Sequence, residues 1–258
     1  LTYGLKSGKY KLNPAHSCKD RVEMEGEMSK IKLSNEKIII TGNGRAGNGV
    51  LEIIQKANIR EVSKSEFLNK TFDEAVFVHL NTMDYNVRID GSKSNKSEFY
   101  KQPELYCSSF MDYTNQADIF IAGHYYSSGS PYLFTRKDAK HSDFNIKVVA
   151  DVSCDIDGPV ASTIRPSTIV DPIYGYNPIS ETEDSFLQEG NIAVMAVDNL
   201  PCELPKDASE DFGNEMLEKI LPSLIMSDDE QIVENATICK NGDLTPNFEY
   251  LRNYVNGN

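Results

Sequence analysis

Four glycines within eight residues form the most informative pattern of this chain. The β-branched segment 36–41 (EKIIIT) runs into GNGRAGNG, which places Gly42, Gly44 and Gly47 at the spacing G-x-G-x-x-G. The first glycine permits a tight turn after a strand, the second lets a ligand approach the backbone, and the third lets a helix pack closely on the sheet. Amides at the start of that helix attract an anion. The pattern therefore predicts binding of a dinucleotide through its pyrophosphate.

The segment after the glycines has the apolar spacing of a helix. Four apolar side chains recur along one face of residues 47–58, at Val50, Ile53, Ile54 and Ala57. A buried strand before the turn and an amphipathic helix after it supply the context that a lone glycine pattern lacks. We expect the pyrophosphate contacts to come from Gly42, Asn43, Gly44, Arg45 and Ala46. Arg45 either supplies a cation to the phosphates or is a solvated loop arginine.

The choice between NAD and NADP depends on the residue that meets the ribose 2′ position. An acid about 20 residues after the first glycine is the usual partner of the 2′-hydroxyl. Here the count ends at Ser63, followed by Lys64. This pair lacks the carboxylate that repels a 2′-phosphate and adds a positive charge, so we expect NADP. Glu61 and Glu66 keep NAD open, and Ser63 has the alternative role of capping the next turn.

Acidic and hydroxyl side chains follow two other predicted strands. Asp151 and Ser153 come at the end of the apolar segment 148–152. The carboxyl ends of the strands in a doubly wound sheet face the ligand, so we expect both residues to contact the coenzyme. Asp155 and Asp198 occupy comparable positions and would hold the ammonium group of a substrate. Turn capping or packing behind the site is the alternative for these side chains.

Composition narrows the function classes. The chain has 39 acidic and 26 basic residues and a net charge of -13, which disfavours nucleic acid and anionic membranes as partners. The sequence has neither an apolar run of about 18 residues nor a signal-peptide pattern, so we expect a cytoplasmic protein. The five cysteines are scattered without a CxxC pair, and the four histidines lack metal-ligand spacing. We therefore expect reduced thiols and no metal site.

Alternating strand-like and helical segments predict the fold class. Over residues 36–160 they indicate βαβ units and hence an α/β fold with a doubly wound parallel sheet of the Rossmann type. We expect strands at 38–40, 59–62, 75–80, 119–122, 148–152 and 191–197, and an ordered loop at 171–178. A later amphipathic helix should place Phe212, Met216 and Ile220 in a core.

Three later segments, taken with the glycine pattern, resemble an enzyme family. They are residues 118–126 (DIFIAGHYY), 148–158 (VVADVSCDIDG) and 197–213 (VDNLPCELPKDASEDFG). All three are similar to segments of the lysine-forming saccharopine dehydrogenases, or lysine-oxoglutarate reductases, of the alanine dehydrogenase and transhydrogenase superfamily. The resemblance runs in the same order from about residue 37 to the C-terminus.

The resemblance implies an NAD(P)-dependent oxidoreductase that interconverts lysine plus 2-oxoglutarate and saccharopine by hydride transfer to an imine. It places His124 and Tyr125 on the nicotinamide side of the coenzyme, which makes His124 the only catalytic candidate in this sequence. The family's catalytic lysine and histidine lie in an N-terminal lobe that precedes the matched region. We therefore expect that lobe to be missing and the isolated chain to lack those groups.

The same resemblance predicts the domain organisation. Residues 1–33 would be a lead-in from the missing lobe, residues 34–178 the dinucleotide-binding domain, and residues 179–258 the last strand and the helices that return to the incomplete lobe. Two alternatives remain open: an alanine dehydrogenase-like enzyme and a non-catalytic dinucleotide-binding module. The expected partners are a small-molecule coenzyme and an amino-acid or keto-acid substrate. A homo-oligomer is also left open, because no surface stripe identifies an interface.

Overall fold

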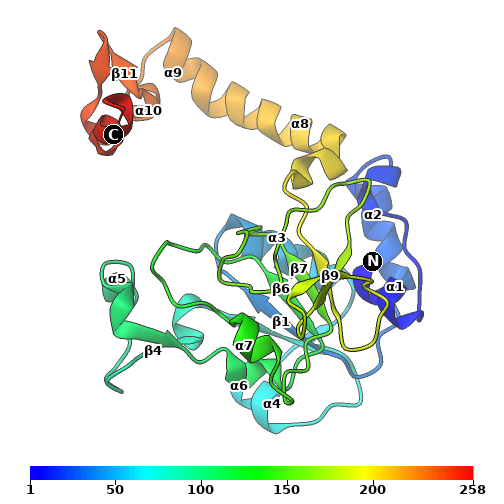
Figure 1. The fold of residues 1–258 in the computed structure, drawn as a ribbon. Coiled ribbons are helices and arrows are strands. Elements are labelled where there is room, and N and C mark those ends of the chain that lie inside the picture. The colour runs from blue at the N-terminus through cyan, green and yellow to red at the C-terminus, as the bar shows by residue number, and fades with distance from the viewer. Residues whose placement is uncertain (258) are drawn as a thin grey trace. The chain divides into compact units, whose positions relative to one another are not determined.

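The computed structural model describes residues 1–257, which form two compact units that divide between Leu204 and Pro205. An eight-stranded sheet lies at the centre of the first unit, with the order β2-β3-β1-β6-β7-β10-β8-β9 (Figure 1). Its strands are β1 (Lys37–Thr41), β2 (Arg60–Glu61), β3 (Val76–Leu80), β6 (Ile119–Ala122), β7 (Val148–Asp151), β8 (Tyr174–Asn177), β9 (Thr182–Asp184) and β10 (Ile192–Met195).

The first six strands of this order run parallel, β8 pairs antiparallel with β10, and β9 pairs antiparallel with β8. The predicted α/β fold with a doubly wound, mostly parallel sheet is confirmed. Residues 171–178, which we expected to form a loop, instead contribute β8. The sequence did not predict this strand because glycine, proline and asparagine, which favour turns, surround its two tyrosines. Both Tyr174 and Tyr176 are nevertheless buried.

Strand β1 contributes side chains to two apolar clusters, one on each face of the sheet. Ile39 belongs to one apolar cluster with Phe67 and Phe120, whereas Ile38 and Ile40 belong to the cluster on the other face. This alternation follows from the period of two along a strand, and β-branched side chains suit such doubly buried positions. Apolar side chains thus pack on both faces of the sheet.

Short helices and a hairpin complete the first unit. Helix α3 (Arg45–Lys56) packs through Val50, Leu51 and Ile54 against the apolar cluster that contains Ile38 and Ile40 of β1. The other elements are α1 (Thr2–Ser7), η1 (Ala15–Ser17), α2 (Arg21–Glu27), η2 (Met28–Lys30), α4 (Lys64–Asn69), η3 (Thr82–Asp84), α5 (Lys96–Phe99), η4 (Pro103–Leu105), α6 (Met111–Thr114), α7 (Arg136–Ala139), η5 (Leu200–Glu203) and the hairpin of β4 (Asn86–Arg88) with β5 (Tyr106–Ser108). Within residues 1–257, no helix is long and apolar enough to cross a membrane.

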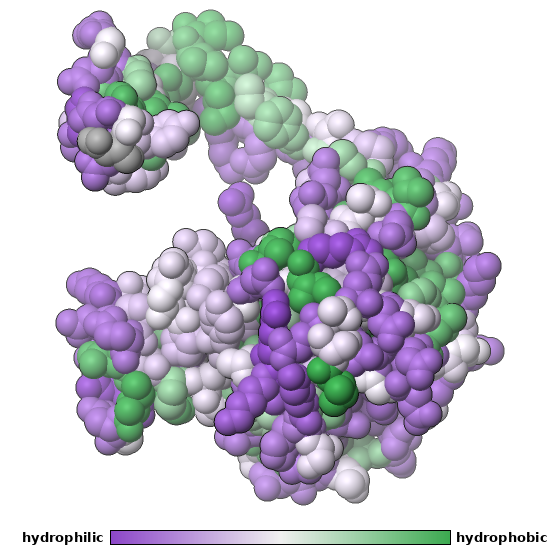
Figure 2. Space-filling model, in the orientation of Figure 1, coloured by the Kyte–Doolittle hydropathy of each residue, from purple (hydrophilic) through white to green (hydrophobic). Residues whose placement is uncertain are grey.

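The second unit has little core of its own. It contains α8 (Pro205–Glu215), η6 (Met216–Ile220), α9 (Leu221–Ile225), α10 (Ile232–Ala236), β11 (Cys239–Lys240), β12 (Asp243–Leu244), η7 (Pro246–Leu251) and α11 (Arg252–Val255). The expectation that Phe212 is core is wrong in this structure, because 68% of its surface is exposed. Leu217 and Met226 are exposed as well. The consecutive helical elements α8, η6 and α9 show an apolar surface in Figure 2. So short a segment cannot bury every apolar side chain of an amphipathic helix.

A buried lysine at the start of β1 leads to a first prediction. The Lys37 ammonium donates hydrogen bonds to the carbonyl oxygens of Phe67 at 2.6 Å and Lys70 at 2.8 Å, and burial lowers its pKa. Lys37→Met should therefore lower the free energy of unfolding by about 2 kcal/mol, because both carbonyls lose their donor. Urea denaturation measures this effect. The exposed Lys32, changed to methionine, is the matched control and should unfold like the wild type; equal effects of the two substitutions would contradict the prediction.

Candidate functional site

The glycine turn after β1 is shaped by close backbone contacts. Gly42 has a φ of 97°, and a Cβ there would lie 2.2 Å from the carbonyl oxygen of Gly123. A Cβ at Gly47 would lie 1.9 Å from the carbonyl oxygen of Gly42. Both positions therefore exclude a side chain, one for the turn and one for helix packing. A Cβ at Gly44 would meet no atom of residues 1–257 within 4 Å, so this glycine borders open space.

The helix that follows presents its N-terminus to this open space. Gly44 is the N-cap of α3, and Asn43, Arg45 and Ala46 are exposed beside it. Free backbone amides at such a helix start, together with the helix dipole, favour an anion. Arg45 makes no ion pair within the described chain, which leaves its charge available. The residues predicted from sequence to hold a pyrophosphate are thus all at one open corner.

The carboxyl ends of four strands lie level with one another at this corner. Thr41 of β1 is in register with Leu80 of β3 and with Ala122 of β6, and Ala122 is in register with Asp151 of β7. The residues that follow these four strands therefore lie along one edge of the sheet. This is the position where open α/β sheets bind their ligands.

His124 follows β6 and is almost completely buried. Its Nδ1 shares a hydrogen bond of 2.9 Å with the Thr41 hydroxyl, while its Nε2 has no partner within residues 1–257. Burial lowers the pKa of His124 to about 4, against the opposing effect of the Asp151 carboxylate. The imidazole is therefore neutral at pH 7 and cannot act as a cation.

Aromatic side chains surround His124. Tyr85 meets it edge to face, with ring centroids 6.4 Å apart, and Phe99, Tyr100 and Tyr126 line the same small pocket. The adjacent Tyr125 is 82% exposed. A flat, exposed ring at a strand end can stack on a planar ligand, so the location of Tyr125 is compatible with its predicted coenzyme contact.

Asp151 organises the loop that follows β7. Its carboxylate is fully buried and accepts hydrogen bonds from the Ser153 amide and hydroxyl, the Cys154 amide and the Thr163 hydroxyl. Both carboxylate oxygens are thus engaged inside the protein, and the Ser153 hydroxyl is bonded to one of them at 2.6 Å. Direct coenzyme contact by Asp151 and Ser153 stays a prediction; in this geometry they hold the loop that follows β7 in place.

The two predicted substrate residues lie on neighbouring strand ends. Asp155 is partly buried, and burial together with the nearby Asp151 carboxylate raises its pKa. Asp198 follows β10 and is exposed. The carboxylates of Asp198 and Asp155 both raise the pKa of the Cys154 thiol, after the larger effect of burial, which places the two acids around one cysteine. A concentration of negative charge at this edge would attract a cationic substrate group.

Ser63 takes the structural role that sequence analysis left as the alternative. Its hydroxyl accepts a hydrogen bond from the Glu66 amide and so caps α4. The Glu66 carboxylate in turn accepts a hydrogen bond from the Ser63 amide. Ser63 also follows β2, which is the edge strand and not the neighbour of β1. A coenzyme contact by Ser63 stays untested.

The sequence predicted a strand at 75–80 but not that this strand lies beside β1. This neighbour is β3, whose His79 donates through Nε2 to the Gly42 carbonyl at 2.7 Å and so supports the glycine turn. Asn81 and Asp84 follow the same strand. The polar segment 81–84 after an apolar strand was the available signal, but counting residues from Gly42 pointed to the preceding strand.

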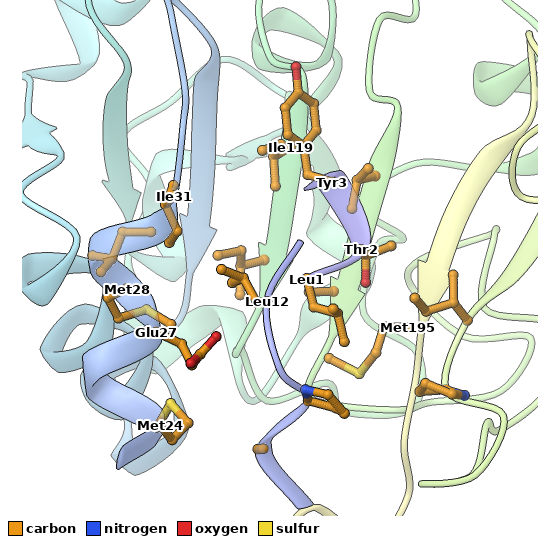
Figure 3. A pocket seen from close by; sticks show the side chains of 18 of the residues that line it. Leu1, Thr2, Tyr3, Leu12, Met24, Glu27, Met28, Ile31, Ile119 and Met195 are labelled. Carbon is orange, nitrogen blue, oxygen red and sulfur yellow. The ribbon is translucent and has the colours of Figure 1, made fainter. Parts of the chain in front are cut away.

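A mostly apolar hollow lies elsewhere in the first unit. About 400 Å³ of space separates the face of the sheet from the N-terminal segment (Figure 3), with Leu1, Leu12 and Met28 on one side and Ile119 and Met195 on the other. Its lining is almost entirely apolar, apart from side chains such as Glu27. None of the residues that line it belongs to the glycine turn at residues 42–47, so it is separate from the glycine corner.

Comparison with known proteins gives sequence relatives. No protein-family model matches the chain. It is 26% identical over 249 residues to the mitochondrial alpha-aminoadipic semialdehyde synthase of Mus musculus, covering 83% of this chain and 26% of that protein. It is 26% identical over 224 residues to the NAD(+)-dependent, L-lysine-forming saccharopine dehydrogenase of Neurospora crassa, covering 83% of this chain and 45% of that protein.

The chain thus spans about a quarter of the length of the first of these relatives. The Schizosaccharomyces pombe saccharopine dehydrogenase is 30% identical over 128 residues, covering 48% of this chain and 30% of that protein. Among solved structures, an L-alanine dehydrogenase matches with a TM-score of 0.48 and 16% identity, covering 86% of this chain and 54% of that one.

Proposed function

We propose, on the premise that this chain is a homologue of the saccharopine dehydrogenases and alpha-aminoadipic semialdehyde synthases, that it is the NAD(P)-binding part of an amino-acid dehydrogenase. The resemblance predicted from sequence is confirmed by these relatives. The reaction proposed for the whole protein is the interconversion of lysine plus 2-oxoglutarate and saccharopine. The coenzyme, when bound, supplies or accepts the hydride at an imine carbon.

One observation carries the proposal: the open corner at Gly44. The backbone is tightly packed at Gly42 and Gly47 but unobstructed at Gly44, and the amides of α3 begin there. A pyrophosphate needs this combination of close backbone approach and oriented donors. The exposed Arg45 adds a positive charge at the same place.

The residues along the edge have complementary proposed roles. Asn43, Arg45 and the α3 amides bind the pyrophosphate, and the neutral His124 with Tyr125 borders the nicotinamide. The exposed carboxylate of Asp198, together with Asp155, attracts the substrate ammonium group. The aromatic side chains around His124 exclude water, which strengthens polar contacts near the reacting atoms.

Changing Gly44 tests coenzyme binding separately from folding. Gly44→Asp should weaken NADH and NADPH binding at least about tenfold, because its carboxylate repels the pyrophosphate. The melting temperature should stay equal or rise, since aspartate is a favourable N-cap. Gly44→Ser, a neutral N-cap, is the matched control with a smaller effect. Fluorescence titration and thermal unfolding give the two measurements; wild-type affinity in Gly44→Asp would contradict the proposed corner.

Substrate assays address the alternatives. Oxidation of NADH or NADPH with lysine plus 2-oxoglutarate supports the proposed reaction, and oxidation only with pyruvate plus ammonia would favour an alanine dehydrogenase-like enzyme. Coenzyme binding without turnover, in this chain and in a version extended to the length of its relatives, would favour a non-catalytic module.

A further inference from the structure

The neighbour of β1 determines where the adenosine ribose lies. In dinucleotide-binding sheets, the residue that meets the ribose 2′ position follows the strand beside the glycine strand. Here this strand is β3, because β1 pairs with β3 through Lys37–Val76 to Thr41–Leu80. Strand β2 lies one position further out and pairs only with β3. The topology therefore moves the ribose position from the end of β2 to the end of β3.

An ion pair occupies the end of β3. Asp84 accepts a hydrogen bond of 2.8 Å from the Asn81 amide through Oδ2, and its Oδ1 forms an ion pair with the ammonium of Lys64. The Asp84 side chain is only 14% exposed, so the carboxylate is held in place, whereas the Lys64 side chain is 51% exposed. Lys64 comes from the start of α4, and the pair thus joins the segments that follow β2 and β3.

Three side chains near the end of β2 were candidates for the ribose position. Two of them, Ser63 and Glu66, are bonded to other groups, and Glu61 lies further back along its strand. The Ser63 hydroxyl bonds to Glu66, and the Glu66 carboxylate is further paired with Lys70. Glu61 is in register with Phe77, three positions before Leu80, at which β3 ends. Glu61 is therefore not level with the strand ends at the glycine corner, and the Glu66 carboxylate is already paired.

We propose that the Lys64–Asp84 pair sets the preference between NAD and NADP. This inference rests on the proposed coenzyme site. A 2′-phosphate brings about two negative charges, which the Asp84 carboxylate repels and the Lys64 ammonium attracts. A 2′-hydroxyl instead donates a hydrogen bond to the carboxylate. The two members of the pair thus act on coenzyme choice in opposite directions.

Asp84→Asn and Lys64→Met test the proposal in the full chain, with the dissociation constants of NADH and NADPH measured by fluorescence titration. In Asp84→Asn the ratio Kd(NADPH)/Kd(NADH) should fall about tenfold, and in Lys64→Met it should rise by a similar factor. Asparagine keeps an oxygen for the Asn81 amide, so the turn should persist. Glu61→Gln removes a carboxylate at the edge strand and is the matched control, with an unchanged ratio.

The outcomes separate the inference from the proposed function. Wild-type protein that binds neither coenzyme overturns the proposed function and this inference with it. Binding of a coenzyme with an unchanged ratio in both variants, or a ratio that moves equally in Glu61→Gln, overturns the inference alone. Equal weakening of both coenzymes in both variants is such an unchanged ratio, and it overturns the inference because the pair then has a structural role only. If Asp84→Asn does not fold, the half-exposed Lys64→Met still decides the question by its ratio.

Discussion

Gly47→Ala is expected to lower the free energy of unfolding by about 3 kcal/mol or more and to abolish coenzyme binding. The added Cβ would lie 1.9 Å from the Gly42 carbonyl oxygen, which is backbone and cannot rotate away. Either α3 moves off the sheet or the turn deforms, and both changes displace the amides at Gly44. Urea denaturation and coenzyme titration measure the two effects.

Gly49→Ala is the matched control in the same helix. A Cβ at Gly49 would meet no atom of the described chain within 4 Å. Alanine favours a helix interior over glycine by up to about 1 kcal/mol, so this variant should be as stable as the wild type or more so. If both alanine variants behave alike, close packing at Gly47 does not control the corner.

Acid should destabilise the chain through His124. An unfolded histidine binds its proton near pH 6.5, whereas the folded chain holds the pKa of His124 at about 4. The folded state therefore binds fewer protons in this range. The stability contribution is complete above pH 6.5 and is lost as the pH falls toward 4, by about 3 kcal/mol in total.

His124→Gln isolates this contribution from the titration of carboxylates. The difference between wild type and variant in free energy of unfolding should change by about 3 kcal/mol between pH 7 and pH 4, favouring the variant at low pH. The exposed His141, changed to glutamine, is the matched control. Parallel pH profiles for wild type and His124→Gln would show that the imidazole is not buried in solution.

The sequence was most informative where the structure depends on local rules. The glycine turn, the apolar strand before it and the helix after it were all predictable, because each follows from the spacing of a few adjacent residues. The position of β3 between β2 and β1 was not, because strand order depends on a crossover between distant segments. For the same reason the ion pair of Lys64 with Asp84 could not be anticipated.

Other parts of the site depend on burial that composition does not reveal. Asp151 has the residue type and strand-end position of a ligand-binding acid. Its carboxylate oxygens, however, accept hydrogen bonds from Ser153, Cys154 and Thr163. His79 supports the glycine turn through its hydrogen bond to the Gly42 carbonyl, which its position at a strand end does not reveal. Such assignments require knowing which polar partners lie within hydrogen-bond distance.

The outermost strands of the sheet bear on how copies of this chain could associate. Strand β2 has two residues, an arginine and a glutamate, and β9 reads Thr-Glu-Asp with every residue exposed. Short, charged borders of this kind discourage intermolecular ladder formation, which needs a long flat edge with unpaired amides and carbonyls. Self-assembly, if the protein undergoes it, should therefore proceed through helical or loop surfaces and not through a sheet continued from one molecule to the next.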